Sequence, residues 1–474
     1  MLQRIRILRN DARPIGKLPP ELLTPIFDLV ATPSEDVDST SSFTNLMSLV
    51  HVCHYWRAIL LNHCGAWSNV HLRGQDPNFL AWQMAYSRSA PLDVTVHLYS
   101  NSGNRLLHNF QTSVKTIREH RGRVRSLSVH AVRHHYPRNL FGFEFPNLEE
   151  LAWDVRGLDP PVQLVGAPKL WSLSVKGTLN WPVVSVTGLT RFKLEGPMAV
   201  TVTDISNFLE QNSTLESLEF ANLHVPAGTP GQIRSVKLHN LTALSFRNVE
   251  HGHILSCLSL PALENLYVGS FEQPIWWSRT VWHNLTLPSG IASLNVKYCG
   301  WEGGFDRVRI TGFDDARTRS LNLTEHSLGT RFNPMLSALA YTPLHTVTSI
   351  SFDEEETNDP RYQLVSPPLR IILGNMPNLR RMDLCWGHLT HQIVEQLRHT
   401  CPELKVLRVK TTRLSCSATF DLVLQMAKAR ATARMWLNEI ECIAAEEEGD
   451  AAKTKELWDT WARNAELGRY LGDR

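Results

Sequence analysis

The chain has 474 residues, more than one compact core usually accommodates, so we expect several domains or an elongated repeat array. Its 48 lysines and arginines nearly balance 46 aspartates and glutamates, and the net charge of +2 gives no general drive toward nucleic acid or an anionic membrane. No apolar run approaches the ~18 residues that a membrane-spanning helix needs, and the first ten residues lack a secretory apolar core.

A basic arm, residues 1–14, begins the chain, and its alternation of arginines with aliphatic residues favours a solvated tail over an import signal. Two amphipathic helices are expected within residues 15–72. Pro20 suits the first helical turn, where proline loses no hydrogen bond, and apolar residues follow at three- and four-residue spacing from Leu22 to Val30. The second helix repeats this pattern from Leu46 to Leu60. Together the two helices carry more apolar surface than they can bury against each other.

This arrangement resembles the F-box, whose motif runs Leu-Pro-x-Glu-Leu-Leu-x-x-Ile-Phe and, after a gap, Leu-x-x-Val-Cys-x-x-Trp-Arg. The gap here, residues 31–44, is longer than in compact F-boxes, and Ala66 stands where a larger apolar residue is usual. The resemblance implies binding to the small Skp adaptor of cullin–RING ubiquitin ligases. A helical hairpin that merely caps a larger domain is the alternative. The residues that match the motif, and that the resemblance assigns to adaptor binding, are Leu18, Pro19, Glu21, Leu22, Leu23, Ile26, Phe27, Leu49, Val52, Cys53, Trp56 and Arg57.

Residues 73–120 connect this domain to the rest of the chain. The spacing predicts a helix over Asn78–Ser87, a strand over Leu92–Tyr99 and a helix over Arg105–His120. We expect the segment to form an N-terminal cap that shields the open edge of the following sheet.

A strand-like Leu-x-x-Leu-x-Leu pattern then recurs through residues 121–417. Its spacing of roughly 19 to 32 residues is close to the leucine-rich-repeat period of 20–29. One strand with its return cannot bury its own apolar face, so neighbouring copies are expected to stack in sequence order. The alternative is a β-sandwich, against which we set the helices predicted at Thr203–Gln211 and Pro334–Tyr341. The copies begin at Val124, Leu148, Leu170, Leu189, Leu215, Leu241, Leu263, Ile291, Leu321, Val347, Leu379 and Leu404.

The chain thus resembles the leucine-rich-repeat F-box proteins over about two thirds of its length. The resemblance implies an α/β fold: a small helical F-box domain, then an irregular leucine-rich-repeat solenoid or α/β horseshoe. Exposed side chains at the x positions would line a concave wall that binds a target protein. The last two repeats are basic, which suggests an acidic or phosphorylated target segment. The candidate target-binding residues are Tyr267, Lys297, Arg380, Arg381, Asp383, Lys405, Arg408 and Lys410.

Residues 418–474 are expected to form a helical C-terminal cap and tail. Apolar residues from Phe420 to Met426 recur at helical spacing, and the pattern continues from Trp436 to Ile443. A polar interruption precedes Trp458 and Trp461, and we interpret the last stretch as a frayed helix rather than a dedicated binding helix.

No residue pattern supports catalysis. The chain has no nucleotide-binding glycine loop, nucleophile elbow or His-Glu-x-x-His motif, so neither an enzyme nor a cofactor or metal site is predicted. The eight cysteines form no Cys-x-x-Cys pair, which favours a reduced cytoplasmic or nuclear compartment. We therefore expect a substrate-recognition subunit of a Skp–cullin–F-box ubiquitin ligase, with no nucleic-acid or membrane partner. The alternative is a non-catalytic repeat scaffold that does not engage the ubiquitin machinery.

Overall fold

The computed structural model describes residues 17–31, 40–72, 77–98, 104–132, 144–156, 166–177, 186–196, 200–223, 235–249, 253–256, 258–270, 290–302, 305–317, 319–327, 339–340, 342, 344–354, 369–385, 387–411 and 416–444. The predicted basic arm, the tail beyond residue 444 and most of the predicted helix Pro334–Tyr341 lie outside these ranges. The chain divides into two compact units, Met1–Met198 and Ala199–Arg474. We describe each unit by itself.

The first unit begins with a helical bundle. Its apolar core joins Leu23 and Phe27 of the first helix to Leu46, Trp56 and Leu60 of the other two. The prediction of a single second helix from Leu46 to Leu60 is therefore wrong, because Cys53 has extended backbone and a new helix begins at His54. Pro20 is the first residue of the first helix, as its missing amide hydrogen predicts. The bundle contains α2 (Pro20–Ala31), α3 (Thr40–Val50), α4 (His54–Asn62) and the short 3-10 helix η2 (Cys64–Trp67).

A parallel sheet follows in the same unit. Its strands pair in chain order, and Val94, Leu127, Leu151, Leu173 and Phe192 stand in register across five of them. These five side chains are buried, so successive copies of the apolar pattern form one continuous core layer. The strands are β1 (Asn69–Leu72), β2 (Leu92–Leu98), β3 (Val124–Val132), β4 (Glu150–Arg156), β5 (Ser172–Gly177) and β6 (Arg191–Glu195), with α5 (Pro77–Ser87), α6 (Asn104–Glu119) and η3 (Arg121–Arg123) between them.

The three elements predicted within residues 73–120 are confirmed, but their expected role as a cap is wrong. The sheet already begins with β1, which pairs in parallel with β2, so this segment is a repeat inside the array rather than a cover for its edge. The physical reason is that Val70 and Leu72 alternate with polar residues at the end of the bundle and are fully buried in the sheet.

The second unit carries a longer open sheet. Its strand order is β7-β9-β11-β14-β13-β12-β15-β16-β17-β18. The strands are β7 (Ser217–Ala221), β9 (Ala243–Arg247), β11 (Asn265–Ser270), β12 (Ser293–Glu302), β13 (Phe305–Phe313), β14 (Ser320–Ser327), β15 (Ser349–Glu354), β16 (Arg381–Cys385), β17 (Val406–Thr411) and β18 (Glu439–Ala444). Two short strands, β8 (Val236–Lys237) and β10 (Leu258–Ser259), pair separately.

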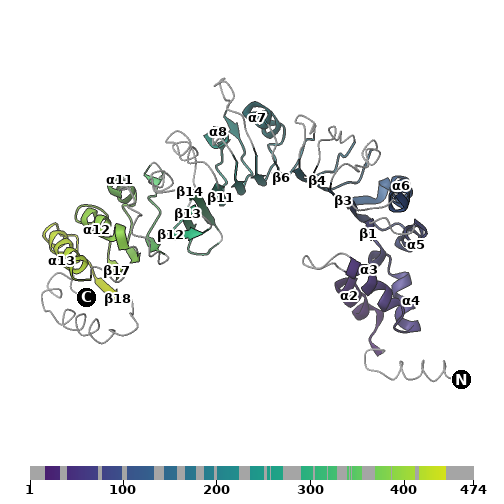
Figure 1. The fold of residues 1–474 in the computed structure, drawn as a ribbon, viewed down its shortest axis with the longest axis horizontal. Coiled ribbons are helices and arrows are strands. Elements are labelled where there is room, and N and C mark those ends of the chain that lie inside the picture. The colour runs from purple at the N-terminus through teal and green to yellow at the C-terminus, as the bar shows by residue number, and fades with distance from the viewer. Residues whose placement is uncertain are drawn as a thin grey trace. The chain divides into compact units, whose positions relative to one another are not determined.

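Helices α11, α12 and α13 of this unit lie on one side of its strands (Figure 1). The first helix, α7, confirms the prediction at Thr203–Gln211. It begins with a capping box in which the Asp204 amide donates to Thr201 Oγ1 at 3.1 Å and the Thr201 amide donates to Asp204 Oδ2 at 3.3 Å. The helices are α7 (Val202–Gln211), α8 (His253–Ser256), α11 (Leu369–Gly374), α12 (Gly387–Gln396) and α13 (Cys416–Thr432).

The prediction that repeats stack in sequence order is wrong at one place. Strand β13 pairs antiparallel with both β12 and β14, so β11 adjoins β14 and β12 adjoins β15. The glycines at 303–304 separate two alternating segments, a hairpin signal that the six-residue repeat pattern does not contain.

The helix predicted from Trp436 to Ile443 is also wrong, because Glu439–Ala444 forms β18, parallel to β17. The apolar spacing here fits both periods, and pairing with β17 satisfies the backbone groups as a strand. The repeat array therefore extends past residue 417. Both units are mixed α/β structures with open, mostly parallel sheets, as predicted. Within the described part of the chain, no helix has the length and apolarity to cross a membrane.

Candidate functional site

Helix α2 carries two apolar stripes. Leu23 and Phe27 are fully buried in the bundle, while Leu22, Ile26 and Leu29 are 55%, 39% and 78% exposed. The exposed three stand at positions i, i+4 and i+7, which places them on one face of the helix. Leu29 was missed in the motif comparison, although its spacing from Ile26 is the signal that adds it to the stripe.

Several motif residues hold the bundle together. The rings of Phe27 and Trp56 meet edge to face with centroids 5.2 Å apart. Cys53 precedes α4 with extended backbone, and its Sγ accepts from the Trp56 amide at 3.4 Å, a cap that explains a polarizable side chain there. Arg57 Nε donates to the Val50 carbonyl oxygen at 3.0 Å and so closes the end of α3. These residues support a surface rather than supply its apolar contacts.

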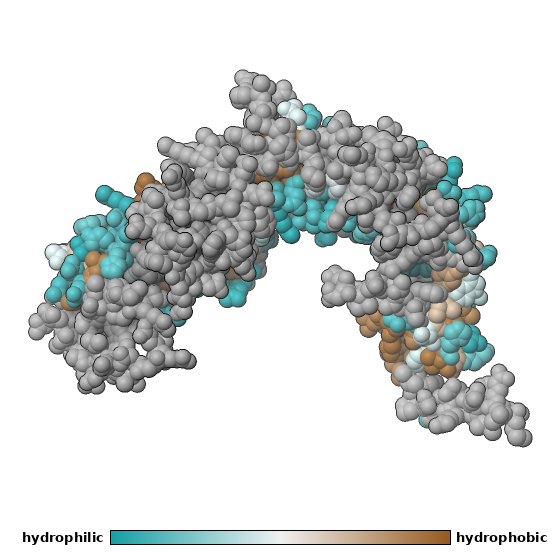
Figure 2. All heavy atoms as spheres, viewed as in Figure 1, coloured by the Kyte–Doolittle hydropathy of each residue, from teal (hydrophilic) through white to brown (hydrophobic). Residues whose placement is uncertain are grey.

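The twelve motif residues therefore divide into core and surface. Val52, between α3 and α4, is 50% exposed and adds to the exposed apolar residues of the bundle. Figure 2 shows apolar side chains exposed on the helical bundle, among hydrophilic ones. Leu23, Phe27 and Trp56 are buried; Leu18, Leu49 and Cys53 are half-buried; Pro19, Glu21, Leu22, Ile26, Val52 and Arg57 are exposed.

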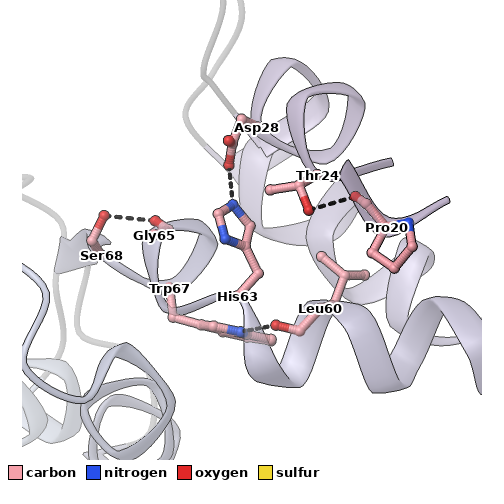
Figure 3. A network of polar contacts seen from close by, with 8 residues as sticks. All are labelled: Pro20, Thr24, Asp28, Leu60, His63, Gly65, Trp67 and Ser68. Atoms are coloured by element: carbon pink, nitrogen blue, oxygen red, sulfur yellow. Dashed lines mark hydrogen bonds and ion pairs between the residues drawn. The ribbon is translucent and has the colours of Figure 1, made fainter. Parts of the chain in front are cut away.

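The bundle is joined to the first repeat through Trp67. Its Nε1 donates to the Leu60 carbonyl oxygen at 2.8 Å (Figure 3). The centre of its ring lies 4.8 Å from that of Trp82 on α5. Gln83 Nε2, also on α5, donates to the carbonyl oxygens of Trp67 and Asn69 at 3.2 and 2.7 Å. Because Trp67 is fully buried, the orientation of the bundle on the first repeat is determined by packing.

A second contact in Figure 3 fixes α2 itself. His63 Nε2 lies 2.6 Å from Asp28 Oδ1, so the end of α4 is bonded to the polar side of α2. Thr24 Oγ1 donates to the Pro20 carbonyl oxygen at 2.8 Å on the same helix. These polar contacts lie on residues other than the exposed apolar stripe.

The strand side chains that alternate with the buried ones form the strand face of each unit. On that of the second unit, Arg247 Nη2 lies 3.3 Å from Glu219 Oε1, and its guanidinium carbon lies 5.4 Å from the centre of the Tyr267 ring. This holds Arg247, 53% exposed, across three neighbouring strands. Tyr267 thus belongs to an ordered polar cluster with Arg247 and Glu219; its role in target binding stays a prediction.

The expectation of a basic wall in the last two repeats needs correction. Arg381 Nε lies 3.1 Å from Asp383 Oδ2, and Arg408 pairs with both Glu439 and Glu441 of β18 at 3.6 and 2.6 Å. The two glutamates were missed because their segment was expected to be a helix.

The remaining predicted target residues do not form one group. Arg380 comes directly before β16, and Lys405 comes directly before β17. The Lys405 amide donates to the Arg380 carbonyl oxygen at 2.8 Å, which extends the pairing of these two strands. Lys410 is exposed at the far end of β17. The Lys297 side chain lies outside the described residues.

No protein-family profile matches this chain, and no curated protein matches it. The resemblance to the F-box therefore stays a prediction from the motif residues.

No metal site is predicted from the sequence, although the bundle contains several histidines and Cys53. In the part of the chain that the structure describes, no group of three or more His, Cys, Asp and Glu side chains is placed to hold a metal ion. His63 instead contacts Asp28, and Cys53 caps α4.

Proposed function

We propose that this chain is a substrate-recognition subunit of a Skp–cullin–F-box type ubiquitin ligase, acting in the cytoplasm or nucleus. In this proposal α2–α4 bind the Skp adaptor and the repeats bind a target protein. The observation that carries it is the exposed stripe of Leu22, Ile26 and Leu29 on a helix whose opposite stripe already fills a core.

The exposed stripe has the chemistry of a protein contact. Contiguous exposed apolar side chains are unusual on a monomer and mark interaction surfaces. Full burial of a leucine or isoleucine stabilises by about 1.5–3 kcal/mol, so the stripe with Val52 can supply several kcal/mol toward an interface.

The repeats would contribute proximity rather than chemistry. A target held on the strand face, joined to the bundle through Trp67 packing, would meet a ubiquitin-loaded enzyme at raised effective concentration. The strand faces of both units carry charged and polar side chains, which suits a polar target. The open parallel arrays support the interpretation as degenerate leucine-rich repeats. The alternative remains a repeat scaffold whose bundle binds no adaptor.

The experiment is co-expression with the Skp adaptor, followed by size-exclusion chromatography and a binding titration. We expect a one-to-one complex with submicromolar affinity. Leu22→Glu should weaken it at least tenfold, because a buried carboxylate in an apolar contact is unfavourable. Ile371→Glu is the matched control, since Ile371 is 51% exposed on α11.

Trp56→Ala is unsuitable as a surface test, because Trp56 is only 8% exposed within the bundle core. It serves as a folding control instead and should reduce the thermal stability of the bundle. If the folded chain does not bind the adaptor, the receptor proposal is wrong and the scaffold alternative remains.

A further inference from the structure

Helix α2 contains a proline in its interior. Pro25 lies five residues after Pro20, the first residue of the helix. An interior proline has no amide hydrogen for the carbonyl oxygen four residues earlier, here that of Glu21, and its ring crowds the same carbonyl. Proline also disfavours helical backbone at the residue before it, here Thr24. The helix is therefore weakest between Thr24 and Pro25.

The first turn of α2 ends at Thr24 and is held from inside by its own hydrogen bonds. The amides of Leu22 and Leu23 donate to the Pro19 carbonyl oxygen at 3.0 and 3.2 Å. Thr24 Oγ1 donates to the carbonyl oxygen four residues earlier at 2.8 Å (Figure 3), and such a hydroxyl bond tends to bend a helix. These bonds all lie before Pro25, so they can form or break while the rest of the helix stays intact.

Contacts with the rest of the bundle keep this turn closed. The Leu23 side chain is fully buried in the core. Tyr55 of α4 contacts the chain just before α2, where its hydroxyl donates to the Leu18 carbonyl oxygen at 3.0 Å. An interior proline costs a helix about as much free energy as the full burial of a leucine side chain returns. The closed turn therefore has only a small net advantage, to which the Tyr55 hydrogen bond adds.

Opening of the first turn would change the exposed apolar stripe. In the closed helix Leu22 lies one turn before Ile26, on the face that also carries Leu29. When residues 20–24 leave the helical conformation, Leu22 no longer lies beside Ile26. The other two stripe residues keep their places, because they stand on the part of α2 that the buried Phe27 side chain anchors. The stripe is thus complete only in the closed form.

We propose that Pro25 makes the first turn of α2 a hinged segment, which opens and closes independently of the rest of the bundle. Only the closed form presents the complete stripe to a protein partner, and the hydrogen bond from Tyr55 favours that form. The statement about the partner rests on the proposed function, in which the partner is the Skp adaptor. The apparent dissociation constant for the adaptor is then the intrinsic constant divided by the closed fraction.

The hinge is tested by hydrogen exchange and mass spectrometry on the full chain without the adaptor. Pro25→Ala restores the missing donor, so the amides of residues 22–24 should exchange at least tenfold more slowly, while those of α4 should change less than twofold. Pro77→Ala is the matched control and should alter neither rate, because Pro77 is the first residue of α5, where an amide has no helical partner. Equal slowing in α2 and α4, or no slowing in residues 22–24, would overturn the proposal.

Tyr55→Phe provides a change of the opposite sign. It keeps the aromatic ring and removes only the hydroxyl that donates to Leu18. We expect residues 22–24 to exchange at least threefold faster in this variant, and the double variant with Pro25→Ala to exchange more slowly than Tyr55→Phe alone. Equal rates in Tyr55→Phe and the native chain would overturn the role assigned to Tyr55.

Adaptor binding tests the second part of the proposal separately. In a titration with the Skp adaptor, Pro25→Ala should bind at least threefold more tightly than the native chain, and Pro77→Ala should bind with native affinity. Unchanged or weaker binding of a Pro25→Ala variant whose first turn exchanges more slowly would overturn the statement that only the closed form binds. A native chain that does not bind the adaptor would overturn the proposed function and this second part with it, while the exchange rates alone would still decide whether the turn is hinged.

Discussion

Arg430 on α13 offers a quantitative test of how the last repeats are held together. Its side chain is fully buried, and its guanidinium donates to the carbonyl oxygens of Leu397, Thr400 and Cys401 at 2.8, 2.8 and 2.9 Å. These carbonyls follow the end of α12, where backbone acceptors have no helical partner. The Arg430 side chain therefore supplies hydrogen bonds to three backbone carbonyl oxygens in the turn between α12 and β17.

The perturbation is Arg430→Met, which keeps much of the side-chain volume and removes every donor. Each buried carbonyl left unsatisfied costs about 1–3 kcal/mol. Against this, burial lowers the pKa of Arg430, which shows that its charge is held at a desolvation cost that the variant recovers. We expect a net local destabilisation of about 3 kcal/mol.

Hydrogen exchange followed by mass spectrometry measures this loss of local stability segment by segment. A loss of about 3 kcal/mol corresponds to roughly a hundredfold faster exchange of amides in α12, β17 and β18 that open by local unfolding. Amides of β3, in the first unit, are the internal control and should not change. Arg430→Lys, with fewer donors in a less suitable geometry, should fall between native and Met. Exchange in the Met variant equal to native would mean that desolvation cancels the hydrogen bonds and would refute the reasoning.

Two further predictions concern the turns and the alkaline limit. Gly196 has φ of +141°, and a Cβ there would lie 2.4 Å from the Gly177 carbonyl oxygen. Gly188 has φ of +83°, but a Cβ there would meet no atom within 4 Å, so Gly196→Ala should lower the melting temperature of the first unit clearly more than Gly188→Ala. Equal decreases in melting temperature would show that backbone strain alone, and not the clash, determines the loss. Burial raises the pKa of the Cys401 thiol from 9.0 to about 11. Because the folded pKa is the higher one, the folded state retains the proton longer, and up to about 2–3 kcal/mol of stability is lost as pH rises from 9 to 11. Cys401→Ala should flatten that part of the stability curve, and a slope identical to native would count against the buried thiol as its source.

Much of the architecture followed from local pattern. Leu127 and Val129, like Leu173 and Val175, are two residues apart with a polar residue between them. This spacing predicted strands with one buried apolar face, because successive side chains of a strand point to opposite faces of the sheet. Pro20 predicted the start of α2 for an equally local reason. Helices α5, α6 and α7 also begin and end close to the predicted residues.

The candidate site was only partly predictable. The motif contained both Leu22 and Leu23 without indicating that Leu23 fills the core while Leu22 faces solvent. That division depends on where α3 and α4 pack, which is a property of the whole bundle. The exposure of Leu29 required the same information.

The sequence by itself determined the period of the strands and the first amphipathic helix, α2. Only the tertiary structure decided that Glu439–Ala444 is a strand, that β13 lies between β12 and β14, and that Arg408 is paired. In each case the deciding partner is another strand, whose backbone hydrogen bonds and facing side chains outweigh the weak local preference of a short apolar segment.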